Sequence, residues 1–231
     1  MKKIGIIGAM DSEVALFREE FSAAETNVSG IYRGTDGKNE LYICRSGVGK
    51  VNAAIAAQKM IDFFGVEKII NSGVAGGIAP GIEKNDAVIS ESLTYHDLTP
   101  ADIMENYPPY CRYIPADKEL IEKALRACEK LNSDLEKAGK PTFKAHVGVI
   151  VSGDCFVSSS EKAQSLYREH KALCTEMEGA AIAHVAHAAG IPFLVLRTVS
   201  DFADEEAEGS FETFEHIAAQ RAAYIVKEIL A

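Results

Sequence analysis

Short apolar runs rich in β-branched residues alternate along this chain with longer segments of helical apolar spacing. The runs have the length of single strands, and their lack of polar alternation indicates burial on both faces. Strand–helix alternation of this kind predicts an α/β fold in three layers, in which helices cover both faces of a central mixed, largely parallel twisted sheet. The strands that we expect cover residues 3–7, 41–45, 68–71, 86–90, 145–151, 172–175 and 193–198.

The expected helices lie between these strands. Asp11 or Ser12 can cap a first helix that runs to about residue 21, and Ser210 can cap the last one. No segment with the composition of a linker interrupts the alternation, and 231 residues suit one domain, so we expect a single domain over residues 1–231. The other helices that we expect cover residues 50–64, 117–138 and 177–189.

Charge and cysteine content exclude several classes of protein. The net charge of −10 argues against nucleic acid or an anionic membrane as a partner. The apolar run after Lys3 is short, acidic residues follow it where a signal peptide would be cleaved, and no other run could span a bilayer. Five cysteines without a C-x-x-C pair indicate free thiols in a reducing compartment. We therefore expect a cytoplasmic protein.

Glycine-rich stretches and histidines give weaker indications. Residues 5–8 lack the spacing of a dinucleotide site, and residues 44–51 lack the first glycine and the Ser/Thr of a P-loop. Residues 71–77 follow a strand and would let the backbone approach a ligand, although a tight crossover turn explains them equally well. His184 and His187 have no H-E-x-x-H pattern or cysteine pair beside them, so we expect no metal site.

Acidic residues stand at the carboxyl ends of the buried strands, where α/β folds bind their ligands. Glu13 falls in the first helical turn after the first strand, Glu176 and Glu178 follow the strand at 172–175, and Asp201 ends the last strand. Helix-dipole capping explains Glu13 or Glu178 taken singly, but not the shared position of all of them. Glu178 and Asp201 are also embedded in apolar sequence, where an unpaired carboxylate is costly. The pattern predicts an acid–base site.

Seven short motifs run through nearly the whole chain. They occupy residues 4–10 with Glu13, 46–51, 72–77, 95–97, 151–156, 176–180 and 197–201. In order and spacing, the set resembles the 5′-methylthioadenosine/S-adenosylhomocysteine nucleosidases of the purine nucleoside phosphorylase superfamily. The resemblance implies a nucleoside phosphorylase-like fold and hydrolysis of the N-glycosidic bond of 5′-methylthioadenosine, S-adenosylhomocysteine or 5′-deoxyadenosine, with no cofactor and no metal.

The resemblance also implies a role for each matching residue. Glu13 would polarise the attacking water with Arg197 nearby, while Asp201, oriented by Ser200, would be the general acid at adenine N7. Glu178 would hold the ribose hydroxyls. Further substrate-binding residues implied by the resemblance are Glu176, Met177 beside the ribose, Phe156 stacked on the base, the backbone of Val157 at the edge of the base, and Met10, Val48 and Phe211 on the 5′ side.

The same resemblance implies a homodimer in which the partner's residues 95–116 close the 5′ pocket. Three departures from the family leave the 5′ substituent open. Val74, beside the ribose, replaces a serine found in many members, and residues 98–100 lack the usual aromatic pattern. The segment 131–142 is longer than usual.

The chemistry explains why such a site needs carboxyl groups. Adenine leaves readily only when N7 is protonated, so an acid must keep its proton near neutral pH, although the pKa of free Asp is about 3.9. Burial in an apolar strand raises that pKa. Ionised carboxylates stabilise the positive charge that develops on the ribose, and one of them can activate water.

Two alternatives stay open at this point. A nucleoside phosphorylase would use the same fold with phosphate as the nucleophile, for which Arg45 and Arg197 are candidate ligands. Glu13 argues against it, because a carboxylate would repel phosphate at close range. A non-catalytic nucleoside-binding module would need the pocket but not the acids.

Overall fold

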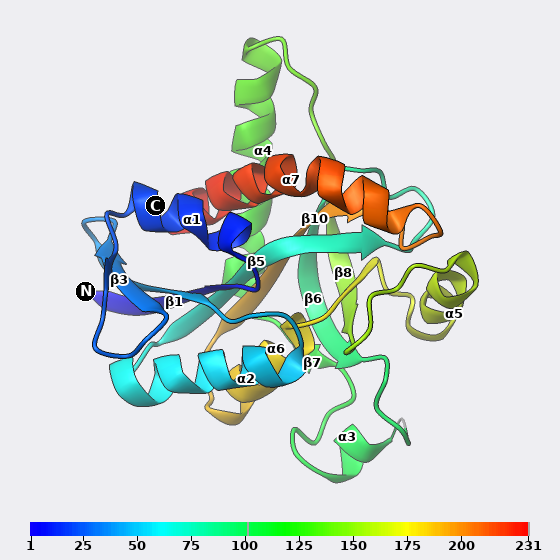
Figure 1. Cartoon of the computed structure of the whole chain (residues 1–231), viewed down its shortest axis with the longest axis horizontal. Coiled ribbons are helices and arrows are strands. Elements are labelled where there is room, and N and C mark those ends of the chain that lie inside the picture. The colour runs from blue at the N-terminus through cyan, green and yellow to red at the C-terminus, as the bar shows by residue number, and fades with distance from the viewer. Residues whose placement is uncertain (101, 231) are drawn as a thin grey trace.

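A mixed sheet of ten strands forms the centre of the part of the chain that the structure describes (Figure 1). The structure is a computed structural model, and it describes residues 1–100 and 102–230, with the backbone alone for residues 210–216. The strands are β1 (Lys2–Gly8), β2 (Ala24–Glu25), β3 (Ile31–Thr35), β4 (Asn39–Arg45), β5 (Lys68–Gly77), β6 (Ala87–Tyr95), β7 (Ile114–Pro115), β8 (Ala145–Ser152), β9 (Cys174–Glu176) and β10 (Phe193–Asp201).

Part of the sheet closes on itself. β5 pairs in parallel with β10, β10 pairs with β6, β6 with β8, β8 with β9, and β9 returns to β5. On the edge opposite β10, β5 pairs with β1, and the sheet continues from β1 through β4 and β3 to β2. β9 crosses β5 near its carboxyl end, where Thr175 pairs with Gly76. This crossing brings the end of β9 to the same place as the ends of β1, β5 and β10.

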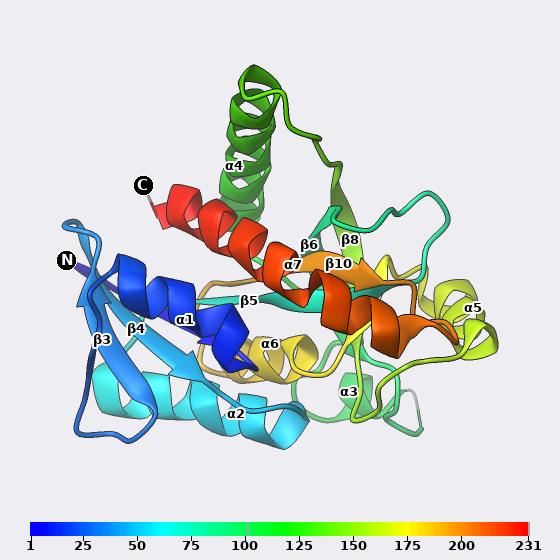
Figure 2. The same cartoon turned by 45° about the horizontal axis from the view of Figure 1, so that its top comes forward.

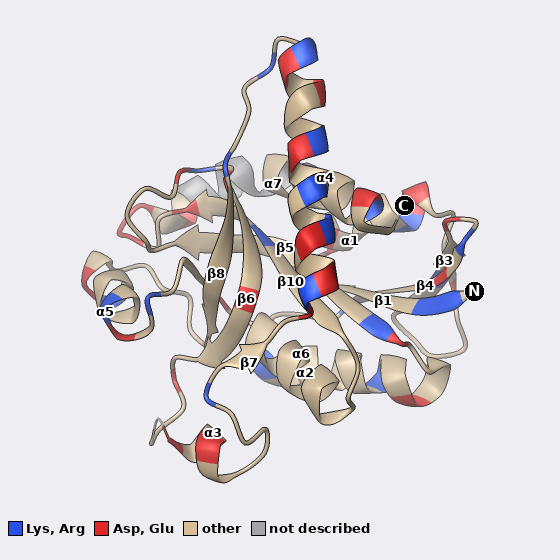
Figure 3. Cartoon of the chain, turned by 180° about the vertical axis from the view of Figure 1, so that it is seen from behind, with Lys and Arg blue, Asp and Glu red and all other residues tan. Residues whose placement is uncertain are grey.

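Helices cover the sheet from two sides. The helices are α1 (Asp11–Glu20), α2 (Lys50–Lys59) with a π-helical turn η1 (Met60–Phe64), α3 (Ile103–Asn106), α4 (Lys118–Lys137), α5 (Ser160–His170), α6 (Gly179–Ala188) and α7 (Ala207–Leu230). α1, α4 and α7 lie on one side of the sheet, and α2 and α6 on the other (Figure 2). Seen from behind, the carboxyl-terminal half of α4 stands away from the body and carries charges of both signs (Figure 3).

The predicted α/β fold with a central mixed sheet is confirmed, and each predicted strand is present. The interpretation of residues 71–77 as a tight turn is wrong, because β5 continues through them to Gly77. Small side chains there allow β5 to pair with β10 along one edge and with β9 along the other.

Both predicted helix caps are wrong. α1 is capped at Met10, not at Asp11 or Ser12, because the Glu13 carboxylate turns back to accept hydrogen bonds at the start of the helix. α7 begins at Ala207, three residues before Ser210, whose side chain lies outside the described residues.

Between residues 1–100 and 102–230, no helix is both long and apolar enough to cross a membrane. The same part of the chain contains no group of three or more His, Cys, Asp or Glu side chains arranged to hold a metal ion. All five cysteines are unpaired.

Candidate active site

A cavity of about 300 Å³ lies where the carboxyl ends of β1, β5, β9 and β10 meet. Ligands bind at this end of the strands in α/β folds, and the position is the one predicted from the sequence. Its lining combines acidic side chains with apolar ones: Ala9, Met10, Glu13, Val48, Val74, Ala75, Gly76, Phe156, Glu176, Met177, Glu178, Ser200 and Asp201.

Glu13 is buried at the base of the cavity and its carboxylate is fixed by backbone donors. Oε2 accepts hydrogen bonds from the N–H of Ala9 at 2.6 Å and of Met10 at 3.1 Å, and Oε1 accepts one from the N–H of Val74 at 3.1 Å. Burial raises the pKa of Glu13 above that of a free glutamate, although Arg197 and these donors oppose the shift. The carboxylate is therefore held in one orientation by the loop between β1 and α1 and by β5.

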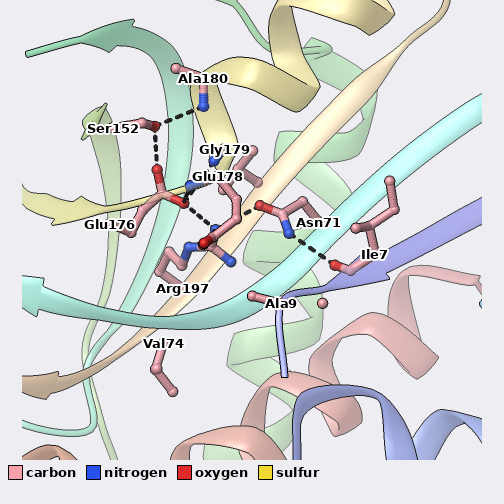
Figure 4. A network of polar contacts seen from close by, with 12 residues as sticks. Ile7, Ala9, Asn71, Val74, Ser152, Glu176, Glu178, Gly179, Ala180 and Arg197 are labelled. Carbon is pink, nitrogen blue, oxygen red and sulfur yellow. Dashed lines mark hydrogen bonds and ion pairs between the residues drawn. The ribbon is translucent and has the colours of Figure 1, made fainter. Parts of the chain in front are cut away.

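Arg197 is buried outside the cavity lining and faces several carboxylates. Its Nη2 donates to Asn71 Oδ1 at 2.7 Å and to Glu176 Oε2, and it lies 3.7 Å from Glu178 Oε2 (Figure 4). A Cβ on Gly73 would stand 2.4 Å from Glu13 Oε1 and 2.6 Å from Arg197 Nη1, so both groups occupy the space that this glycine leaves free. Burial of Arg197 opposes its charge, but the surrounding carboxylates raise its pKa further above its usual range and keep it ionised.

Glu176 is the carboxylate most tightly bound to Arg197. It also accepts hydrogen bonds from Ser152 Oγ and from the N–H of Gly179 at 2.7 Å. Although burial opposes ionisation, the charge of Arg197 and the Ser152 hydroxyl hold the pKa of Glu176 below its usual range. Glu176 therefore compensates the charge of Arg197 and fixes the start of α6.

Glu178 has fewer donors and faces the cavity. Its Oε1 accepts a hydrogen bond from the N–H of Gly49 at 2.8 Å. Burial and the neighbouring charge of Glu176 raise the pKa of Glu178 to about 7. Glu176 and Glu178 are two residues apart, but their pKa values are shifted in opposite directions, because Arg197 is bound mainly to Glu176.

Asp201 forms another wall of the cavity. Its Oδ2 accepts a hydrogen bond from Ser200 Oγ at 2.8 Å and its Oδ1 accepts one from the N–H of Ala203 at 2.8 Å. Burial raises the pKa of Asp201 above that of a free aspartate, against the opposing effect of these two donors. A Cβ on Gly76 would stand 2.8 Å from Asp201 Oδ1, so β5 can pass this carboxyl group only with glycine at that position.

Most of the residues that the sequence predicted for the site are brought together in the lining. Val48 and Phe156 stand at its mouth with about half of their surface exposed, 51% and 45% respectively. Met10 and Met177 are half-buried, and Val74 is buried.

Two of the predicted residues with described side chains do not line the cavity. Arg197 is buried outside the lining, and the side chain of Val157 is buried in a small apolar cluster with Leu166 and Ala203. The side chain of Phe211 lies outside the described residues. The lining also includes three residues that the sequence prediction did not assign to it: Ala9, Ala75 and Gly76.

The small residues at 71–77 were the sequence signal for two of the additional positions, since they indicated close approach to a ligand. Ala9 had no such signal. It lines the site through its place between β1 and α1, where its N–H meets Glu13.

The chain is similar to known proteins along nearly its whole length. The model of the phosphorylase superfamily matches residues 3–231. A 5′-methylthioadenosine/S-adenosylhomocysteine nucleosidase of Listeria monocytogenes is 37% identical over 236 residues, which cover 98% of this chain and 98% of that protein.

Solved structures are also similar to this chain along its whole length. The 5′-methylthioadenosine/S-adenosylhomocysteine nucleosidase of Neisseria meningitidis, in complex with methylthio-immucillin-A, is 34% identical with a TM-score of 0.88, over 100% of this chain and 99% of that one. A futalosine hydrolase mutant of Helicobacter pylori is 32% identical with a TM-score of 0.88, over 100% and 99%. The chain therefore belongs to the phosphorylase superfamily and, within it, to the family of the 5′-methylthioadenosine/S-adenosylhomocysteine nucleosidases.

Proposed function

We propose that this enzyme hydrolyses the N-glycosidic bond of 5′-methylthioadenosine and S-adenosylhomocysteine, releasing adenine and the 5′-modified ribose, and that 5′-deoxyadenosine is a further substrate. The observation that carries the proposal is the convergence of Glu13, Glu178 and Asp201 on one cavity of about 300 Å³. The family membership of the chain supports the same reaction.

In this mechanism Asp201 is the general acid. Its raised pKa favours the protonated form, and the proton passes to adenine N7 as the glycosidic bond breaks. Ser200 orients the carboxyl group through its hydrogen bond to Oδ2. Protonation makes adenine a neutral leaving group, so the barrier to cleavage falls.

Glu13 is the base that activates water. Burial raises the pKa of Glu13, but Arg197 and three backbone donors oppose that shift and favour the ionised form, which can accept a proton from water. As the ribose gains positive character, the carboxylates of Glu13 and Glu178 stabilise it. The proton of the attacking water passes to Glu13.

The remaining lining residues bind the substrate. We assign Glu178 to the ribose hydroxyls with Met177 beside it, Phe156 to the face of the base, and the backbone of Val157 to its edge. Further lining positions in this proposal are Met10, Val48 and Phe211 on the 5′ side and Val74 near the ribose.

Water, not phosphate, is the nucleophile in this proposal. Among the described residues, the cavity lining contains no lysine or arginine, and the nearest arginine is already bound by Glu176. A phosphate dianion would therefore meet Glu13 without a compensating cation.

The test is the release of free adenine from 5′-methylthioadenosine by the purified enzyme, with and without phosphate. We expect a rate independent of phosphate and a free 5-methylthioribose product. A rate that rises in proportion to phosphate, with a sugar 1-phosphate as product, would establish a phosphorylase instead. If no adenine is released under either condition, the protein is a non-catalytic nucleoside-binding module.

Comparing kcat/KM across nucleosides identifies the 5′ substituent that the enzyme prefers. The panel contains 5′-methylthioadenosine, S-adenosylhomocysteine and 5′-deoxyadenosine, and it includes futalosine because a futalosine hydrolase has a closely similar structure. We expect the first two to be the best substrates.

We also propose that the single domain over residues 1–231 works as a homodimer. Large apolar side chains are exposed on α2 and in the loop around α3, which lie on the same side of the molecule (Figures 1 and 2). Val51 and Tyr110 are each 69% exposed, and Tyr107 is 64% exposed. Light scattering should give twice the mass of one chain, and Val51→Asp should lower it.

A further inference from the structure

A cluster of paired charges beside the cavity has no role in the reaction proposed above. Lys50 begins α2, Asp97 follows β6, and Asp154 follows β8. The Lys50 ammonium donates to both carboxylate oxygens of Asp97 at 2.6 Å and lies 3.6 Å from Asp154 Oδ2. The side chains of Lys50 and Asp97 are only 22% and 28% exposed, so solvent screens this pair less than it screens fully exposed pairs.

Backbone donors complete the cluster. The N–H of Lys50 donates to Asp154 Oδ1 at 2.8 Å, and the N–H of Asp154 donates to Asp97 Oδ2 at 2.8 Å. Hydrogen bonds to ionised carboxylates are shorter and stronger than neutral ones. The cluster therefore ties together three loops, which precede α2, follow β6 and follow β8.

Two of these loops line the cavity. The loop before α2 carries Val48, which is in the lining, and Gly49, whose N–H donates to Glu178 Oε1 at 2.8 Å. The loop after β8 carries Phe156, two residues beyond Asp154. Gly49 has a φ of +97°, and a Cβ on it would stand 3.1 Å from Asp154 Oδ1. The close contact between the two loops thus needs glycine at position 49.

We propose that Lys50, Asp97 and Asp154 form a clamp that positions Gly49 against Glu178 and Phe156 against the bound nucleoside. These three are positioning residues, since none of them lines the cavity. The kinetic consequences rest on the proposed function, whereas the position of Gly49 can be measured without any substrate.

The kinetic test replaces Lys50 by methionine, which removes the charged amine and keeps most of the length of the unbranched side chain. We expect KM for 5′-methylthioadenosine to rise about tenfold, the effect of losing about one hydrogen bond to a charged group, while kcat falls less. Glu13 and Asp201 are held by other elements, so the chemical step keeps its geometry. The conservative Lys50→Arg variant should stay within about threefold of the wild type.

Two further variants control this result. Lys59→Met changes an exposed lysine at the last position of the same helix and should leave KM unchanged. Asp97→Asn should reproduce the effect of Lys50→Met, and the double variant should be no worse than either single one, because the residues act as a unit.

The substrate-free test follows the amide resonance of Gly49 against pH in protein labelled with ¹⁵N-glycine. In the wild type this resonance should report the titration of Glu178, and Glu178→Gln should abolish the step. The Gly49 N–H stabilises ionised Glu178 and so lowers its pKa. In Lys50→Met the step should therefore move to higher pH or lose amplitude.

An unchanged Gly49 titration in folded Lys50→Met overturns the clamp, whatever the value of KM. If Lys50→Met does not fold, Asp97→Asn gives the same decision. If the wild type releases no adenine, the proposed function fails, and the Gly49 titration still decides whether the clamp exists.

Discussion

Asp86 and Asp201 are two buried aspartates beside the same strand, with exposures of 3% and 2%. Asp86 precedes β6, where its backbone accepts a hydrogen bond from Val199 of β10, and Asp201 ends β10. The side chain of Asp86 accepts hydrogen bonds from the N–H groups of Lys144 and Glu83 at 2.9 and 3.0 Å, and it meets His146 Nε2 at 2.8 Å. Asp86 does not line the cavity.

The environment of Asp201 is poorer in donors and open to a ligand. It has one backbone donor and one hydroxyl donor, and it faces the cavity. The two aspartates are therefore equally buried but differ in their hydrogen-bond partners and in their access to a ligand. The partners of Asp86 bind both of its carboxyl oxygens and hold a turn in place, whereas burial of Asp201 favours its neutral form and leaves a proton available to a bound molecule.

The largest expected effect separates these two aspartates. Asp201→Asn should lower kcat on 5′-methylthioadenosine by about 10²-fold or more, the usual size of general acid catalysis, because the amide cannot supply the proton. Its melting temperature should stay close to that of the wild type. Steady-state kinetics and a thermal melt measure both quantities, and a folded variant with normal kcat would remove Asp201 from the mechanism.

Asp86→Asn is the matched control. An amide at this position cannot accept all the hydrogen bonds of the carboxylate, so we expect a loss of about 2 kcal/mol of stability, or roughly 4–8 °C in Tm. The activity of the folded variant at 25 °C should be within about threefold of the wild type. A large loss of kcat here would show that burial alone, and not position in the cavity, decides which aspartate matters.

A second pair of variants tests the packing of the site against packing elsewhere in the sheet. In Gly73→Ala the new methyl group would meet Glu13 and Arg197, both of which are fixed by other partners, so kcat/KM should fall at least about tenfold. In Gly148→Ala it would meet Leu173 Cδ1 at 2.7 Å, and this half-buried side chain can turn away. Gly148→Ala should therefore keep its kcat/KM, and equal losses in both variants would contradict a fixed position for Glu13.

Sequence patterns predicted the apolar strands of the sheet. β1, β5 and β10 are buried along most of their length and were all expected, as was β8, whose first half is only partly buried. β3 has Arg33 and Gly34 at its centre, and β2 and β7 have two residues each, so none of them forms an apolar run that could be identified. Their pairing comes from the neighbouring strand, which a local pattern does not report.

The positions of Glu13, Glu178 and Asp201 followed from the ends of the strands, because parallel strands gather their carboxyl ends at one edge. Of their partners, the family resemblance placed Ser200 beside Asp201 and Arg197 near Glu13, but other contacts between distant segments around the site did not follow. Arg197 bonds to Asn71, which is 126 residues away, and Lys50 bonds to Asp97, 47 residues away. Such contacts depend on how the sheet closes between β9 and β5, and nothing local in the sequence specifies that closure.

The smallest expected effect comes from a similar comparison of two acids within the site, Glu176 and Glu178. The pKa of Glu178 is raised to about 7 from an unfolded value near 4.3, so its ionisation lowers stability as pH rises through this range, and the loss is complete above about pH 7. The pKa of Glu176 is lowered, so its ionisation adds stability above about pH 4.3 that is lost as pH falls through the folded value.

Replacement by glutamine should therefore act with opposite signs. Relative to the wild type, Glu178→Gln should melt about 2–4 °C higher at pH 8, a gain of about 1 kcal/mol, and show little difference at pH 4. Glu176→Gln should melt lower at pH 8 and recover part of the difference at pH 4. Melting temperatures at the two pH values measure both. If both variants were destabilised equally at pH 8, Arg197 would stabilise the two carboxylates to the same extent. Glu178 would then be a structural acid with its own partners, like Asp86, and would not be available to bind the ribose.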